Sequence, residues 1–199
     1  MAMPPIPPPG TPGSTQAAVV RIADIGSSGY TSLDEGSRLP AGVGLMATFS
    51  VQPIGHVRGG REVPEDDDWG GSEARIELDP KRFTKEALEG LDTFSHAEVV
   101  FVFDRVGDGE ITYDARHPRG RKDWPKVGIF AQRGKNRPNR IGVSVCRIVR
   151  VEGLTVVVGG LDAIDGTPVI DIKPVMSGFA PRGDVTEPAW AKEIMAGYW

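Results

Sequence analysis

The sequence predicts a mainly β protein, organised as a small antiparallel β-barrel with one short helix. Gly (26 residues) and Pro (17 residues) exceed ordinary usage in this chain of 199 residues, so turns must interrupt the chain often. Seven short apolar runs lie between these turns, and only one segment has the spacing of an amphipathic helix. Many short strands separated by turns are typical of a closed or nearly closed antiparallel barrel.

Residues 1–46 precede the predicted barrel. The first sixteen are rich in Pro, Gly, Ser and Thr and offer little to bury, so we predict a disordered N-terminal tail over residues 1–46. Met46 stands just before the first patterned sequence. An alternative hypothesis is that Met46 is the true start and that the upstream segment is a mis-annotated start. The barrel domain is expected to cover residues 47–176.

Three strands are predicted in the first half of the barrel. Phe49–Val57 is strand-like, Ala74–Leu78 alternates between apolar and charged residues, and His96–Phe103 is apolar enough for burial on both faces. Arg61–Gly71, between the first two strands, is an acidic loop. Because a run of like charges is usually solvated, the alternative to a functional role is that this loop is simply exposed to water.

The predicted helix covers Asp79–Leu91. Asp79 can cap its N-terminus, and Pro80 suits its first turn. Four apolar residues then recur on one face: Phe83, Ala87, Leu88 and Leu91.

Four further strands are predicted in the second half: Val127–Ala131, Ile141–Val151, Leu154–Gly159 and Thr167–Ile172. Glu152 and Gly153 are candidates for a tight turn. The apolar phase slips between Val145 and Ile148, which predicts a β-bulge. Residues 177–199 end in an amphipathic piece, Pro188–Trp199, which we expect to pack on the barrel or on a partner subunit.

The net charge of −4 conceals a strong asymmetry. The segment Arg116–Arg150 holds eleven Lys and Arg residues against one acid, Asp123, so it carries +10 and the rest of the chain carries −14. The functional interpretation is a basic face for phosphate on a protein otherwise too acidic for indiscriminate binding of nucleic acid. The alternative is that these cations are merely solvated.

Several classes of protein are excluded by the sequence. No apolar stretch is long enough for a membrane span, and the start lacks the basic and apolar regions of a secretory signal. The single cysteine, Cys146, rules out an internal disulfide, and the three histidines lack metal-ligand spacing, so no metal site is predicted. No dinucleotide-binding or phosphate-loop glycine motif is present. We therefore expect a cytoplasmic protein without a Rossmann domain.

Two segments concentrate chemically useful residues. Gly128–Gly142 (GIFAQRGKNRPNRIG) crowds four cations into eight residues, which requires an anion or an acidic partner; a surface loop paired with neighbouring carboxylates is the alternative. Leu161–Pro174 (LDAIDGTPVIDIKP) carries three aspartates around a Gly turn, and such residues often only cap the turn. A lone histidine entering a strand, as His96 does, is more often a hydrogen-bonded core residue than a catalyst.

These two segments, with GLDTFSHAEVVFVF before them, resemble the TsaA-like, TrmO-type proteins over Phe49–Val175. The resemblance implies a small β-barrel, usually dimeric, that binds S-adenosylmethionine without a Rossmann domain. It also implies methylation of N6 of threonylcarbamoyladenosine, the modified base next to the tRNA anticodon. Homodimerisation and binding to the anticodon loop of tRNA are thus expected, with no binding to DNA or membranes.

The resemblance also implies the cofactor-binding residues. They are Pro64, Glu65, Asp66, Asp104, Arg105, Arg133, Leu161, Asp162, Ala163, Ile164 and Asp165. The chemistry agrees, because aspartates can accept hydrogen bonds from ribose hydroxyls or an ammonium, and Arg133 can clamp a carboxylate bidentately. The chain departs from the family pattern at Gln132, Gly134, Arg140, Glu65 and Val175, which lie near the expected acceptor side.

Methyl transfer to an exocyclic nitrogen needs a group that takes up its proton. The candidates are, in order, Asp104, Asp165 and His96. Five basic residues are expected to hold RNA phosphates: Arg119, Arg121, Lys135, Arg137 and Arg140. Two alternatives stay open: a methyltransferase of the same fold that acts on a small molecule or another RNA, and a non-catalytic barrel that binds S-adenosylmethionine or RNA.

Overall fold

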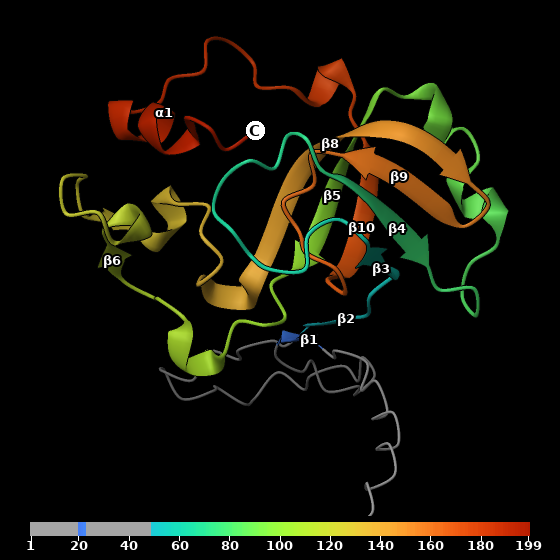
Figure 1. The fold of residues 1–199 in the computed structure, drawn as a ribbon, viewed down its shortest axis with the longest axis horizontal. Helices are drawn as coiled ribbons and strands as arrows, with labels where there is room; N and C mark the ends of the chain where they lie inside the picture. The colour runs from blue at the N-terminus through green and yellow to red at the C-terminus, as the bar shows by residue number, and fades with distance from the viewer. Residues whose placement is uncertain (1–19, 23–48) are drawn as a thin grey trace, which may run out of the picture.

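The computed structural model of the chain describes residues 20–22 and 49–199 (Figure 1). The expectation of a disordered tail or a mis-annotated start over residues 1–46 lies outside the described residues, apart from the short strand β1, Val20–Ile22. β1 pairs antiparallel with β2, Phe49–Val51.

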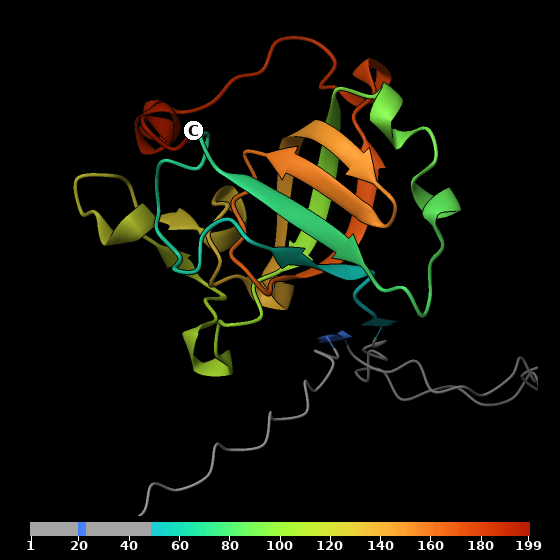
Figure 2. The ribbon, with the colours of Figure 1, turned by 45° about the vertical axis from the view of Figure 1, so that its right-hand side comes forward.

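Six strands close into an antiparallel barrel, which confirms the predicted fold class (Figure 2). Their order around the barrel is β10-β3-β4-β9-β8-β5, and β5 pairs back with β10. The barrel strands are β3 Gly55–Arg58, β4 Glu73–Leu78, β5 His96–Val102, β8 Ile141–Glu152, β9 Thr155–Gly159 and β10 Pro168–Pro174.

Strand alternation fills the barrel interior. In β4, Ala74, Ile76 and Leu78 are buried while the charged residues between them are exposed. Among the described residues the largest fully buried side chain is Phe101, whose ring packs edge-on against Phe103 with centroids 5.3 Å apart. Phe101 fits because the facing position, Gly142, has no side chain: a Cβ there would lie 2.4 Å from the Phe101 ring. The interior is therefore a packed core with one oversized ring accommodated by a glycine.

The predicted helix over Asp79–Leu91 is wrong. The segment forms two short 3-10 helices, η1 Lys85–Leu88 and η2 Leu91–Thr93. The Asp79 side chain does accept a hydrogen bond from the backbone N–H of Lys81 (2.9 Å). However, Thr84 is extended, so no continuous helix passes it. The apolar stripe packs Leu88, Phe83 and Leu91 onto one end of the barrel core, and this tertiary packing overrides the helical pattern.

Three strand predictions also needed correction. The first predicted strand, Phe49–Val57, is divided between β2 and β3, and β2 lies outside the barrel. Of Val127–Ala131 only β7, Val127–Gly128, is extended, and it pairs with β6, Ala115–Arg116, in a separate two-stranded sheet. β5 is not buried on both faces, because every second residue from His96 to Val100 is partly exposed.

The remaining details lie close to the predictions. The pairing of β8 with β9 shifts register between Ile148 and Arg150, slightly later than the predicted bulge. The amphipathic C-terminal piece is helical only over α1, Ala189–Met195. Five further 3-10 helices occupy the connections: η3 Asp108–Glu110, η4 Pro118–Gly120, η5 Ile129–Ala131, η6 Pro138–Arg140 and η7 Ser177–Phe179. Within residues 20–22 and 49–199, no helix has the length and apolar character needed to cross a membrane.

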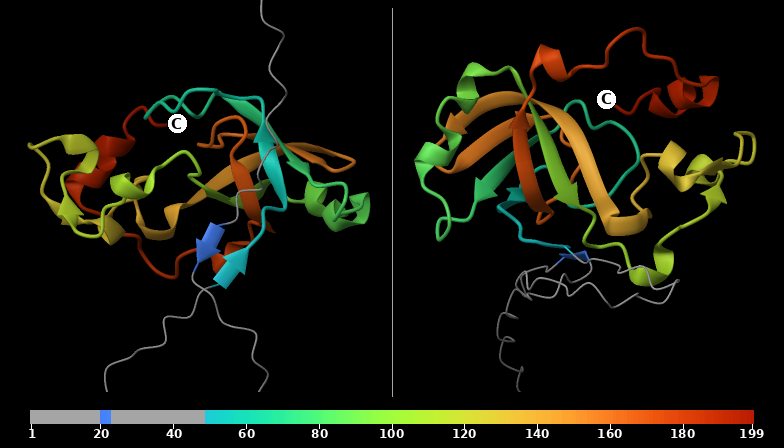
Figure 3. Two further views of the ribbon diagram at one scale, coloured as in Figure 1. Left: turned by 90° about the horizontal axis from the view of Figure 1, so that it is seen from below. Right: turned by 180° about the vertical axis from the view of Figure 1, so that it is seen from behind.

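Three long connections leave the same end of the barrel (Figure 3). We call them the acidic loop (residues 59–72, between β3 and β4), the basic lobe (residues 103–140, between β5 and β8) and the aspartate bend (residues 160–167, between β9 and β10). η1 and η2 lie at the opposite end. After β10 the chain returns across the barrel, and α1 approaches the basic lobe. Barrel topology thus gathers the predicted site segments at one end.

Candidate functional site

Asp165 joins the aspartate bend to the acidic loop. Its Oδ1 accepts a hydrogen bond from the backbone N–H of Gly59 (2.8 Å), and its own backbone N–H donates to the carbonyl of Arg61 (2.8 Å). Arg105, at the start of the basic lobe, donates to the carbonyls of Asp165 (3.0 Å) and Glu62 (3.3 Å). These contacts match the interpretation of this aspartate as a cap of loop structure.

The Asp162 carboxylate is held at both of its oxygens at this end of the barrel. Its Oδ1 accepts a hydrogen bond from the Ser144 hydroxyl on β8, and its Oδ2 accepts one from the Tyr198 hydroxyl (2.6 Å). Burial, followed by the charge of Asp162, raises the pKa of Tyr198 far above its usual value. The phenol therefore stays protonated and remains a donor to Asp162.

Arg133 meets the aspartate bend at the start of β8. Its Nη2 donates to the carbonyl of Val143 (2.6 Å), and Val143 directly precedes Ser144, which holds Asp162. The Arg133 charge also acts on Tyr198, where it opposes the rise in pKa. Among the described residues, Nε and Nη1 of this exposed arginine have no hydrogen-bond partner. Nη2 carries two N–H groups and uses only one of them, so the guanidinium keeps one bidentate edge available for a ligand near the carboxylate that Ser144 and Tyr198 hold.

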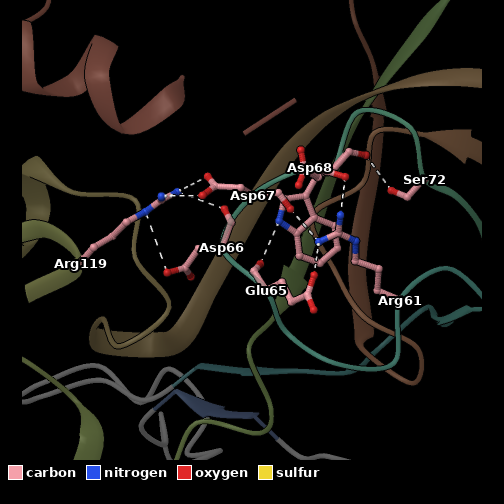
Figure 4. A network of polar contacts seen from close by, with 8 residues as sticks. Arg61, Glu65, Asp66, Asp67, Asp68, Ser72 and Arg119 are labelled. Atoms are coloured by element: carbon pink, nitrogen blue, oxygen red, sulfur yellow. Dashed lines mark hydrogen bonds and ion pairs between the residues drawn. The ribbon is translucent and has the colours of Figure 1, made fainter. Parts of the chain in front are cut away.

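The acidic loop is held from both sides by arginines (Figure 4). Arg61 donates to the carbonyls of Asp67 (2.7 Å) and Asp68 and stacks on Trp69, with its guanidinium carbon 4.5 Å from the ring centroid. Arg119, from the basic lobe, donates to both carboxylate oxygens of Asp67 (2.9 and 2.7 Å). This hydrogen bonding lowers the pKa of the Asp67 carboxyl. The charge run is therefore tied to the basic lobe and is not merely solvated.

The three cofactor-site residues predicted in the acidic loop, Pro64, Glu65 and Asp66, are exposed. The backbone carbonyl of Glu65 accepts a hydrogen bond from the Trp69 indole (3.1 Å). The Glu65 carboxylate makes only a loose contact with Arg61 (3.5 Å). In the aspartate bend, by contrast, Leu161, Ala163 and Ile164 are buried and anchor the backbone that presents Asp162.

The C-terminal segment completes this end of the barrel. Backbone N–H groups of Asp68 and Trp69 donate to the carbonyls of Gly197 (2.9 Å) and Tyr198 (2.8 Å). The Trp124 indole donates to the Glu193 carboxylate (2.7 Å), which joins α1 to the basic lobe. Tyr198 was missed from the sequence, where only the amphipathic pattern of residues 188–199 marked the segment. A link across 36 residues to Asp162 leaves no local signal.

Tyr198→Phe is expected to lower the free energy of unfolding by roughly 1.5–3 kcal/mol, because it removes a hydrogen bond to a charged, half-buried carboxylate. Urea denaturation followed by circular dichroism measures the change. Tyr113→Phe is the matched control, since Tyr113 is 76% exposed and should tolerate loss of its hydroxyl. Equal stability of the two variants would contradict a structural role for the Tyr198–Asp162 bond.

The predicted phosphate-binding residues differ in their availability. Arg140 donates to the Val106 carbonyl (2.6 Å) and to Asp108 (2.5 Å), and Arg137 donates to the Gln132 carbonyl (3.0 Å). Arg121 pairs with Asp123 and stacks on Trp124, while Arg119 holds Asp67. Only Lys135 among the five has a side chain that makes no hydrogen bond or ion pair with any described residue. It is the cation of this set that is uncommitted to the fold.

The structure separates one of the three proton-acceptor candidates, His96, from the other two, Asp104 and Asp165. Asp104 follows the C-terminal end of β5, at the site end of the barrel, and is exposed. His96 begins the same strand, so about 20 Å of extended chain separates it from Asp104, and its Nδ1 contacts the Ser95 hydroxyl (2.9 Å). His56 on β3 lies within electrostatic reach of Asp104, although burial and then Arg58 lower its pKa. The site end therefore includes Asp104 and Asp165 but not His96.

Over residues 20–22 and 49–199 the structure shows no group of three His, Cys, Asp or Glu side chains that could hold a metal ion. Cys146 is fully buried in the barrel, and burial raises the pKa of its thiol to about 12, which keeps it protonated and unreactive.

Fold and site together define a class: a small antiparallel barrel that presents an arginine and a set of aspartates from three loops at one end. Residues 59–180 match the family described as the tRNA-methyltransferase O N-terminal domain. This match covers more than half of the chain, which therefore belongs to that family.

Individual relatives agree with the family. A mouse tRNA (adenine(37)-N6)-methyltransferase is 41% identical over 93 residues, which are 47% of this chain and 21% of the relative. A Pseudomonas aeruginosa protein, provisionally named an S-adenosylmethionine-dependent methyltransferase, is 35% identical over 149 residues (71% of this chain, 59% of the relative). The crystal structure of TrmO from Pseudomonas aeruginosa superposes with a TM-score of 0.56 and 31% identity, covering 69% of this chain and 60% of that one. The chain thus spans less than two thirds of the length of these relatives.

Proposed function

We propose that this chain is an S-adenosylmethionine-dependent methyltransferase that acts on N6 of threonylcarbamoyladenosine, next to the anticodon of tRNA. The observation that carries the proposal is the convergence of Arg133 and Asp162 at the start of β8, in a chain of the tRNA-methyltransferase O family. Relatives named as tRNA (adenine(37)-N6)-methyltransferases support the choice of acceptor.

The donor set fits the polar groups of S-adenosylmethionine. The available edge of Arg133 can bind the carboxylate of the amino-acid part in a bidentate manner. Asp162 accepts one hydrogen bond at each oxygen and retains lone pairs for ribose hydroxyls or an ammonium. The cofactor, when bound, supplies a methyl group activated on a sulfonium. The task of the barrel end is to align acceptor and methyl group and to exclude water.

We assign uptake of the N6 proton to Asp104. It is exposed at the site end of the barrel, whereas Asp165 already uses Oδ1 to accept the Gly59 amide. His96 has no part in this proposal, because it lies at the other end of β5.

The function is tested by methyl transfer. Radiolabelled S-adenosylmethionine is incubated with the protein and with tRNA that carries threonylcarbamoyladenosine but lacks its N6 methyl group. The tRNA nucleosides are then analysed by mass spectrometry. The expected product is one added methyl group on the threonylcarbamoylated base. Formation of S-adenosylhomocysteine with an added small molecule, but not with tRNA, would instead point to a small-molecule acceptor, and cofactor binding without turnover would point to a non-catalytic barrel.

Lys135→Ala is expected to weaken tRNA binding by about three- to tenfold at low salt, because it removes an uncommitted phosphate partner. The slope of log affinity against log salt concentration should become shallower by about 0.7–0.9. Fluorescence anisotropy of labelled tRNA over a salt series measures both quantities. Lys85→Ala at the opposite end of the barrel is the control. An unchanged slope in Lys135→Ala would remove this residue from the interface.

We further propose that the protein is a cytoplasmic homodimer in which residues 47–176 form the catalytic barrel and residues 177–199 pack on it. Apolar side chains exposed on and after the barrel strands support a subunit contact: Val145, Val175, Met176 and Phe179. Sedimentation equilibrium is expected to give twice the chain mass. A monomer at micromolar concentration would contradict this assembly.

A further inference from the structure

Two aromatic side chains stand exposed on the basic lobe. Tyr113 and Phe130 are each 76% exposed. A large aromatic side chain gains roughly 2–3 kcal/mol when it is covered, so exposed rings in an ordered region are candidates for contact with a partner.

The backbone brings these two residues close together. Ala115 and Arg116 of β6 pair with Gly128 and Val127 of β7. The Ile129 N–H then donates to the Asp114 carbonyl (3.0 Å), which continues the pairing by one step. Tyr113 and Phe130 are the next residues on the two sides of this bond, Tyr113 ahead of β6 and Phe130 in η5, so both lie beside the same end of the small sheet.

Two cations, Lys135 and Arg137, lie next to this aromatic pair. The Thr112 N–H donates to the Asn136 carbonyl (2.9 Å), so Tyr113 is one residue away from a contact flanked by Lys135 and Arg137. Arg137 in turn donates to the carbonyl of Gln132, two residues beyond Phe130. Phe130, Lys135 and Arg137 lie in the segment Arg116–Arg150, which carries a net charge of +10, and the Thr112–Asn136 bond ties Tyr113 to it.

We propose that Tyr113 and Phe130 form a stacking platform for unpaired bases of RNA, while the neighbouring cations hold the phosphates. This inference rests on the proposed function and identifies the occupant as the single-stranded anticodon loop. Aromatic faces accept any base, and positive grooves interleaved with aromatics are how single strands are bound. In a two-fold symmetric contact, a second copy of this chain would bring the same basic segment to this face and be repelled, so charge complementarity favours RNA over such a contact.

The test uses the full chain and a fluorescent anticodon stem-loop RNA. Phe130→Ala and Tyr113→Ala are each expected to weaken binding about 5- to 100-fold. The salt slope should stay at the wild-type value, because no charge is removed, whereas Lys135→Ala should make it shallower. Phe130→Trp is expected to restore binding. Phe49→Ala is the matched control, since Phe49 is an exposed aromatic residue (59%) on β2, outside the barrel and away from the basic lobe.

Each alternative outcome overturns a distinct claim. Wild-type affinity of both alanine variants, with binding by the wild-type chain intact, contradicts the platform alone. Loss of dimerisation in Phe130→Ala, measured by light scattering, would show instead that the rings form a subunit interface. Failure of the wild-type chain to bind any tRNA or stem-loop contradicts the proposed function as well. Thermal melts of each variant are expected to match wild type, because both side chains are solvent-exposed.

Discussion

Arg133→Ala is expected to abolish measurable binding of S-adenosylmethionine in isothermal titration calorimetry, a loss of about 100-fold or more. The proposed contact is a bidentate, charge-assisted pair between the guanidinium and the cofactor carboxylate, and truncation leaves that carboxylate without its partner. The bond from Nη2 to the Val143 carbonyl (2.6 Å) fixes the orientation of the guanidinium.

Two further variants make this result interpretable. Arg133→Lys retains the charge but loses the planar fork, so its affinity should fall between those of wild type and the alanine variant. Arg75→Ala is the matched control, because Arg75 lies on the outer face of β4 beside Glu77 (3.6 Å), away from the site loops. Affinity of Arg133→Ala close to the wild-type value would eliminate the carboxylate clamp.

Gly55→Ala is expected to destabilise the fold by about 3 kcal/mol or more. A Cβ at Gly55 would lie 2.2 Å from the Glu77 carbonyl oxygen and 2.9 Å from the Leu78 Cα, and backbone atoms cannot rotate away. Gly55 pairs with Leu78 on one side and Val169 on the other, so the collision falls where β3 joins β4 to β10 and helps to close the barrel. Overpacking costs most where the surroundings are rigid.

The measurement is urea denaturation followed by intrinsic fluorescence. Gly178→Ala is the control, because a Cβ there meets nothing within 4 Å and its backbone is not in the left-handed region. We expect this variant to change stability by less than about 0.5 kcal/mol. If Gly55→Ala were as stable as Gly178→Ala, the close approach of β3 to β4 would be wrong.

The strands were predictable where their signal is local. Ala74, Ile76 and Leu78 alternate with charged residues, and the sequence therefore reveals the buried face of β4 without any knowledge of its partners. The same reasoning failed for the stripe of Phe83, Leu88 and Leu91. Its spacing indicates a helix, but these side chains cover the end of the barrel from two 3-10 turns.

The candidate site was predictable in part. The basic segment and the three aspartates were evident from the sequence, and the resemblance supplied their expected ligand. The position of His96 at the start of β5 could also have separated it from Asp104, since both flank the same strand. No sequence pattern indicated that Arg119 would pair with Asp67, 52 residues away. Nor did the sequence show that, of the five predicted phosphate-binding residues, only Lys135 has a side chain without a partner in the described part of the chain.

By itself, the sequence determined the β class, the placement of most strands and the segments in which the reactive residues lie. These properties depend on alternation, turns and local charge, which act over a few residues. Only the tertiary structure decided that Asp165 caps Gly59 across 106 residues, that Tyr198 reaches Asp162, and that Arg133 lies beside them. Barrel closure brings these segments together, and closure depends on the pairing of all six strands at once.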